Sequence, residues 1–127
     1  MTQSQKERIK LLNSQLYKYS SGKDGKPYFC PCLKDCIYIK HKFIRETVYH
    51  ASKSVNSTFI ALHLIEFINV AKKTQVTYPK NNKNQKPFKE IIILKSTIKN
   101  IGTAKITIGV NKKDNGKIFY CITSFDI

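Results

Sequence analysis

The chain has 127 residues, the size of one domain and enough to bury a hydrophobic core. Its 41% apolar residues exclude extensive disorder. No apolar run approaches the roughly 20 residues of a membrane-spanning helix, and the start, MTQSQKERIKLL, contains no apolar segment typical of a secretory signal. We therefore expect a protein that acts in the cytoplasm without a membrane, either as given or delivered as part of a larger secreted or phage protein.

The charge is strongly one-sided. The chain carries 23 Lys and Arg against 8 Asp and Glu, a formal net charge of +15. Between Phe67 and Lys113, Glu90 is the only acidic residue. Such an excess favours association with polyanions, so nucleic acid is the first partner to expect. Lysine is also abundant in proteins from AT-rich genomes, and charge alone does not separate the two explanations.

The N-terminal part is expected to contain one helix and two short strands. Apolar residues recur every three or four positions over residues 4–19, which predicts a helix. Two short β-prone runs follow at 28–32 and 36–43. We expect residues 1–37 to form a lead-in with a helix and cysteines, ahead of a domain over residues 38–127.

Three of the four cysteines are clustered. Cys30, Cys32 and Cys36 form a C-P-C-x3-C pattern, and Cys121 lies far along the chain. Zinc sites usually contain C-x2-C pairs, so this spacing departs from that signature. A zinc site, a disulfide from the cluster to Cys121 and reduced thiols are all compatible with it. We predict no metal and no cofactor.

Two helices are expected next. The segment 45–53 is expected to form a short helix with Val48 and Ala51 facing inward. Residues 58–73 are nearly all apolar, which predicts one long helix that is buried on most sides and lies across a sheet. Its narrow polar stripe includes His63, which we interpret as a partly exposed stripe residue rather than a ligand.

The C-terminal half is expected to supply about four antiparallel strands. Strands are predicted at 74–78 and 88–99, with an exposed basic loop over 79–87 between them. A hairpin over 103–124 has the clearest pattern, with an Asn-Gly turn. The fold class is therefore α+β, with N-terminal helices packed on one face of an antiparallel sheet of about four strands.

Strict alternation assigns the hairpin's side chains to two faces. The apolar residues at alternate positions would form an aliphatic face, among them Ala104, Ile106, Ile108 and Tyr120. The other face would carry a row of lysines and threonines, which suits an anionic ligand: Thr103, Lys105, Thr107, Lys117 and Thr123.

The sequence excludes several kinds of enzyme. It contains no glycine-rich phosphate loop and no carboxylate cluster able to hold two magnesium ions. A nuclease of this composition would therefore act without metal, which is feasible on RNA because the 2′-hydroxyl can attack its own phosphate.

Three segments together resemble the barnase–EndoU–colicin–RelE superfamily of metal-independent ribonucleases. They are RETVYHASKS at residues 45–54, the apolar stretch after it, and GTAKITIGVNKKDNGKIFYCITS at residues 102–124. The likeness covers roughly residues 38–127 and is nearest to the branch in phage and mobile-element polyvalent proteins and polymorphic toxins. It implies cleavage of RNA by 2′-hydroxyl attack and an immunity or antitoxin protein as a possible partner.

The resemblance also implies a set of site residues. His50 would be the acid or base, Lys53 a phosphate ligand, and Thr107 and Thr123 hydroxyl donors from late strands. The barnase-like catalytic glutamate has no equivalent, which leaves the base unassigned. The nucleic-acid contacts would come from lysines of the strands and hairpin: Lys95, Lys105, Lys112, Lys113 and Lys117.

Two competing hypotheses remain. One is a non-catalytic nucleic-acid-binding or accessory domain of a phage or conjugative element. The other is a structural protein whose charge reflects genome composition alone. The ribonuclease should cleave RNA, the binding domain should bind RNA in a salt-sensitive manner, and the structural protein should do neither.

Overall fold

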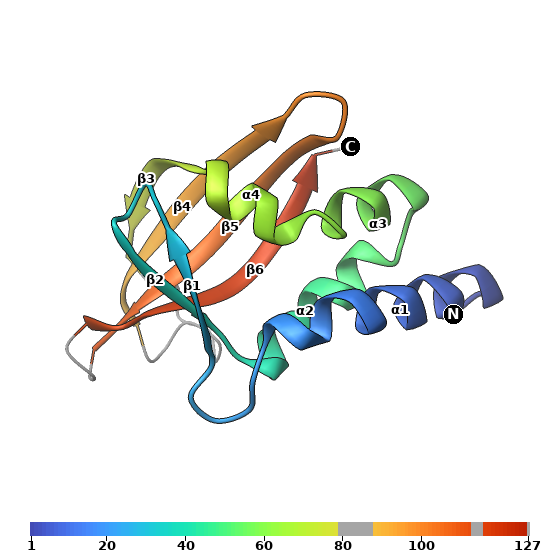
Figure 1. Cartoon of the computed structure of the whole chain (residues 1–127), viewed down its shortest axis with the longest axis horizontal. Coiled ribbons are helices and arrows are strands. Elements are labelled where there is room, and N and C mark those ends of the chain that lie inside the picture. The colour runs from blue at the N-terminus through green and yellow to red at the C-terminus, as the bar shows by residue number, and fades with distance from the viewer. Residues whose placement is uncertain (79–87, 113–115, 127) are drawn as a thin grey trace.

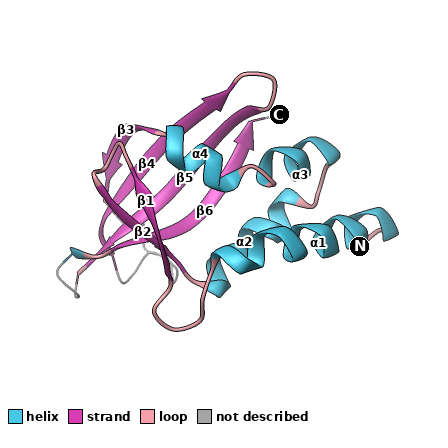
Figure 2. Ribbon diagram, viewed as in Figure 1, coloured by secondary structure: helices cyan, strands magenta, loops and turns pink. Residues whose placement is uncertain are grey.

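A computed structural model describes residues 1–78, 88–112 and 116–126 of the chain (Figure 1). Within these described residues, four α-helices lie against one face of a six-stranded sheet with strand order β1-β2-β6-β5-β4-β3 (Figure 2). The class is therefore α+β, as predicted. The basic loop expected over 79–87 lies outside the described residues.

The sheet differs from the prediction in size and in direction. The strands are β1 (Lys26–Cys30), β2 (Asp35–Ile39), β3 (Lys72–Thr77), β4 (Phe88–Ile98), β5 (Gly102–Asn111) and β6 (Ile118–Asp126). Their count is six rather than four because the β1–β2 hairpin joins the sheet. It joins through a parallel pairing of Ile37 and Tyr38 with Ile118 and Phe119, so the sheet is mixed. Local patterns in the sequence carry no information about such a long-range pairing.

The N-terminal residues share the core of the rest of the chain. Helix α1 (Gln3–Leu16) begins at Thr2, whose side chain accepts a hydrogen bond from the Gln5 backbone N–H, and ends in the 3-10 turn η1 (Tyr17–Tyr19). Leu12 and Leu16 are fully buried in the main hydrophobic cluster. The expected lead-in over residues 1–37 thus contributes a helix and a hairpin to the same layers as residues 38–127.

Helix α2 (His41–Ala51) starts earlier than predicted, where a strand was expected to continue to residue 43. The two predicted inward residues, Val48 and Ala51, are buried as expected, and Phe43 and Ile44 join them. His41 helps to fix this start. Its backbone N–H donates to the Ser21 carbonyl, and its Nδ1 lies 2.7 Å from Ser20 Oγ.

The single long helix predicted over 58–73 is wrong. Two short helices, α3 (Val55–Ala61) and α4 (Leu64–Val70), replace it, and β3 begins at Lys72. His63 is the N-cap of α4, and its Nδ1 lies 2.9 Å from Glu66 Oε1, three residues on. The His63 side chain makes no capping hydrogen bond to the backbone of α4, so this contact is an exposed side-chain pair three residues apart on the first turn of the new helix. His63 is partly exposed, as predicted.

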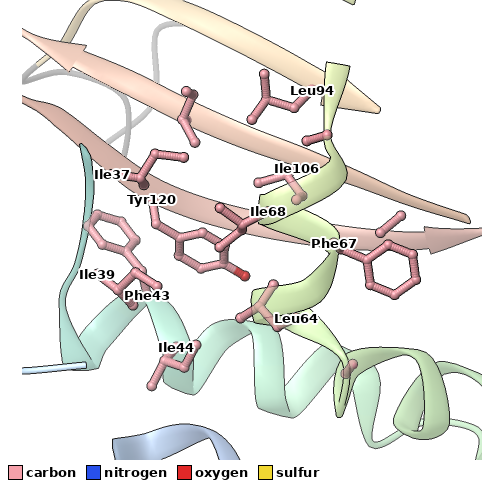
Figure 3. Close-up of a cluster of buried hydrophobic side chains, with 14 of the residues drawn as sticks. Ile37, Ile39, Phe43, Ile44, Leu64, Phe67, Ile68, Leu94, Ile106 and Tyr120 are labelled. Atoms are coloured by element: carbon pink, nitrogen blue, oxygen red, sulfur yellow. The ribbon is translucent and has the colours of Figure 1, made fainter. Parts of the chain in front are cut away.

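The core lies between this helical layer and the sheet. Figure 3 shows Tyr120 surrounded by Ile37, Ile39, Phe43 and Ile68, which come from β2, α2 and α4. These side chains have little or no exposed surface, and the burial of apolar surface in such a core is the largest favourable contribution to folding. No helix in the described ranges is long and apolar enough to cross a membrane.

Candidate nucleic-acid interface

The face of the sheet opposite the helices, here called the open face, has two unlike halves. A second buried cluster lies where β4 and β6 begin, and its members are Phe88 and Ile91 of β4 and Phe119 and Cys121 of β6. Phe88 covers Gly109: a Cβ added at Gly109 would lie 2.4 Å from the Phe88 ring. The other half of the open face carries lysines and threonines.

Three lysines form a row across this polar half. In the strand register, Lys72 of β3 pairs with Lys95 of β4, and Lys95 pairs with Lys105 of β5. Paired residues of adjacent strands share a face, and all three side chains are exposed. Lys72, Lys95 and Lys105 are here called the lysine row. No ion pair links the row to a carboxylate among the residues that the structure describes.

Threonines flank the row on both sides. Thr97 and Thr103 pair in the register on one side, and their hydroxyl oxygens lie 3.0 Å apart. Thr107 pairs with Ile93 on the other side and is half-buried. The arrangement offers ammonium and hydroxyl donors side by side, which suits phosphate oxygens.

The register places Thr123 differently from the prediction. Ile108 pairs with Tyr120 but Thr107 pairs with Ile122, so Cys121 is an extra residue in β6. This β-bulge turns Thr123, which pairs with Ile106, toward the helices. Thr123 is 1% exposed, so its assignment to the polar face is wrong. Tyr120 lies on the helix-covered face, as its alternation predicted.

Thr123 belongs to a buried hydroxyl network. Its Oγ1 lies 2.7 Å from the Tyr120 hydroxyl, which also hydrogen-bonds to Thr47 of α2. All three residues are buried. Burial raises the pKa of the Tyr120 phenol far above its ordinary value, against an opposing contribution from the two threonine hydrogen bonds. The network joins α2 to β6, and its hydroxyls are buried where an RNA strand cannot reach them.

The other two predicted catalytic residues lie on the helical layer. His50 and Lys53 are exposed at the C-terminal end of α2, on either side of Tyr49. The His50 and Tyr49 rings lie 5.6 Å apart, and Lys53 Nζ lies 5.1 Å from the Tyr49 ring centre. Because Thr107 lies on the open face, the sheet separates it from this pair.

The remaining predicted lysines lie beyond the row. Lys112 is exposed at the end of β5, and Lys113 lies outside the described residues. Lys117 is half-buried, with Nζ 4.2 Å from the centre of the Tyr38 ring. Sequence reasoning missed Lys72, because β3 was expected to start at residue 74. The feature of the sequence that pointed to Lys72 as a possible contact was its position in a lysine-rich segment.

The cysteines hold no disulfide: all four are free thiols. Among the described residues, no group of three or more His, Cys, Asp or Glu side chains has an arrangement that could hold a metal ion. Comparison of the chain with protein-family models, curated proteins and solved structures found no match.

Proposed function

We propose that the chain binds RNA through the lysine row on the open face of its sheet. One observation supports this above all: two successive cross-strand pairs join like charges, Lys72 with Lys95 and Lys95 with Lys105. Adjacent strands lie about 4.8 Å apart, and like charges directly opposite each other destabilise a sheet. A phosphate backbone bound across the strands offsets that repulsion.

The composition of the chain supports the same proposal. With a net charge of +15, the protein has no surplus of carboxylates to neutralise the row. Thr97 and Thr103 lie beside the row and are able to donate to phosphate or sugar oxygens. None of these groups reads a base edge, so we expect binding with little sequence preference.

Fluorescence anisotropy with a short labelled single-stranded RNA tests the proposal. Affinity is measured at several salt concentrations for the wild type, Lys95→Ser and Lys105→Ser. Each row variant is expected to bind more weakly and to reduce the log–log salt slope by about 0.7, the value for one phosphate contact on a single strand. Lys10→Ser is the matched control, since Lys10 is exposed on α1 in the helical layer.

The control decides the interpretation. If Lys10→Ser weakens binding as much as the row variants do, the RNA responds to net charge and the lysine row is not an interface. If none of the variants changes binding, the proposal fails. Equal binding of heparin and RNA, with the same response to the variants, would make the row a general polyanion site.

Metal-independent cleavage stays a prediction from the resemblance. At the positions of β4 and β5 that face outward with the lysine row, no described side chain is a histidine or a carboxylate, and Glu90 pairs with Val110 on the other face. Incubation with total RNA in EDTA, wild type beside His50→Ala, tests it directly. Fragments ending in 2′,3′-cyclic phosphate that disappear with His50→Ala would establish the ribonuclease. If the RNA stays intact but is still bound, the ribonuclease hypothesis is excluded and the non-catalytic binding module is favoured.

A further inference from the structure

Two of the four thiols lie next to each other. Cys30 Sγ and Cys32 Sγ are 3.6 Å apart at the tip of the β1–β2 hairpin. Cys30 is the last residue of β1 and pairs with Asp35, whereas Cys32 lies in the turn over residues 31–34. The two sulfur atoms are in van der Waals contact and no atom lies between them.

The backbone of the turn holds this arrangement. The Leu33 N–H donates to the Cys30 carbonyl at 3.1 Å, and the Lys34 N–H donates to the Pro31 carbonyl at 3.2 Å. Pro31 occupies the second position of the first turn, where its fixed φ matches the geometry required. Lys34 completes the reversal with a positive φ of 53°. The local chain therefore has few ways to move Cys32 away from Cys30.

The two thiols differ in access to solvent. Cys30 is fully buried, and its thiol donates to the Ile68 carbonyl at 3.7 Å, near the end of α4. Burial raises the pKa of Cys30 to about 11, and the neighbouring Cys32 thiol adds to the shift. Cys32 is exposed. An oxidant from solvent therefore meets Cys32 first and Cys30 only through it.

We propose that Cys30 and Cys32 form a redox modification site that hydrogen peroxide converts to an intramolecular disulfide. The Cys32 thiolate attacks one peroxide oxygen and becomes a sulfenic acid, with hydroxide as the leaving group. The Cys30 sulfur then attacks the Cys32 sulfur. An S–S bond forms, the Cys32 S–O bond breaks, and water leaves with the Cys30 proton. In total, two thiols and one peroxide give one disulfide and two waters.

Oxidation also changes a contact beyond the hairpin. The disulfide has no S–H, so the Ile68 carbonyl loses the Cys30 donor and keeps the Ala71 backbone N–H at 3.5 Å. Ala71 connects α4 to β3, whose first residue is Lys72. The site does not depend on RNA binding, and its test uses no RNA.

Peptide mapping tests the proposal on the full chain. Native protein is treated with peroxide, unfolded with N-ethylmaleimide to label free thiols, and digested with trypsin. Because trypsin does not cleave Lys26–Pro27, peptide 24–34 contains Cys30 and Cys32 together, whereas 35–40 contains Cys36 and 118–127 contains Cys121. We expect peptide 24–34 to lose two hydrogens and take no label, while the other two stay fully labelled. Dithiothreitol should restore two labels to 24–34.

Two variants separate this pair from general thiol oxidation. Cys36→Ser should leave the disulfide in 24–34 unchanged, because Cys36 lies on the neighbouring strand and is not part of the pair. Cys32→Ser should leave Cys30 reduced and labelled. A cross-link between peptide 24–34 and either other peptide would overturn the proposal. So would sulfinic acid at Cys32 with Cys30 still labelled in the wild type, a result that needs no variant to fold.

Discussion

Lys95 of β4 lies directly opposite Lys105 of β5, and both side chains are exposed on the open face of the sheet. The pair continues on the other side of β4 to Lys72. A sheet that evolved for stability alone would place a carboxylate or a neutral residue at the middle of such a row. We therefore expect the row to lower folding stability while it favours binding of an anion. Both the free energy of unfolding and the affinity for RNA can be measured.

Lys105→Glu should raise stability and weaken RNA binding together. The substitution turns a like-charge pair into an opposite-charge pair with Lys95, which should raise the free energy of unfolding by up to about 1 kcal/mol. The same carboxylate should repel phosphate. Urea unfolding and RNA anisotropy on one preparation measure both effects. Lys10→Glu, on α1, makes the same change in net charge and should alter stability by no more than about 0.5 kcal/mol. Lower stability for Lys105→Glu would contradict the assigned register.

Tyr120→Phe should cost about 1–2 kcal/mol, because it removes the shared partner of two buried hydroxyls, those of Thr47 and Thr123. Thr123→Val should cost less, because the Tyr120 hydroxyl keeps its hydrogen bond with Thr47. The double variant should cost less than the sum of the two, since the Tyr120–Thr123 hydrogen bond is lost only once. Thr103→Val is the control: Thr103 makes its hydroxyl contact at an exposed position and should cost less than about 0.5 kcal/mol. Strictly additive effects would mean that the two hydroxyls are not coupled.

The placement of Thr123 shows where reading the sequence reaches its limit. Alternation correctly put Ala104, Ile106 and Tyr120 on the helix-covered face and Lys105 on the other, because a strand has a period of two. One inserted residue, Cys121, shifts the phase, and everything after it changes face. Nothing in the local sequence marks that residue, since a bulge depends on how the partner strand is paired.

Contacts between segments far apart in the sequence could not be predicted either. The β1–β2 hairpin reads as two short β-prone runs, but its place beside β6 depends on a parallel pairing between residues about 80 positions apart. The break at His63 falls on the polar stripe of the expected helix, where the helical spacing of polar and apolar residues continues without interruption, so periodicity gave no sign of it. The net charge and the alternation of the strand residues predicted that one face of the sheet carries lysines. They did not predict which lysines lie side by side, because that depends on the register between strands.

Gly109→Ala should destabilise the protein by about 1–3 kcal/mol. A methyl group at this position would lie 2.4 Å from the Phe88 ring, closer than carbon atoms approach, so the ring must move and disturb the small cluster on the open face. Gly22→Ala is the matched control, because its new Cβ would lie at an ordinary 3.8 Å from His41. Urea unfolding of the two variants measures the difference. Similar small effects for both would mean that Phe88 does not cover Gly109.

Stability should fall as the pH rises above about 9, partly through Cys121. Burial, helped by the Glu46 carboxylate and opposed by Lys42, raises the pKa of Cys121 to about 12. Below pH 9 the thiol is protonated in both the folded and unfolded states and contributes no pH dependence. Between about 9 and 12 only the unfolded state loses the proton, so unfolding becomes more favourable as the pH rises.

At about pH 10.5 this single thiol should account for about 2 kcal/mol. To isolate the contribution of this one thiol, the wild type is compared with Cys121→Ala at each pH, in the presence of a reductant. The variant lacks the Cys121 thiol and keeps every other ionisable group. The stability advantage of the wild type over Cys121→Ala should therefore shrink by about 2 kcal/mol between pH 8 and pH 10.5. A difference that stays constant would mean that Cys121 titrates alike in the folded and unfolded states, and that the thiol is open to solvent.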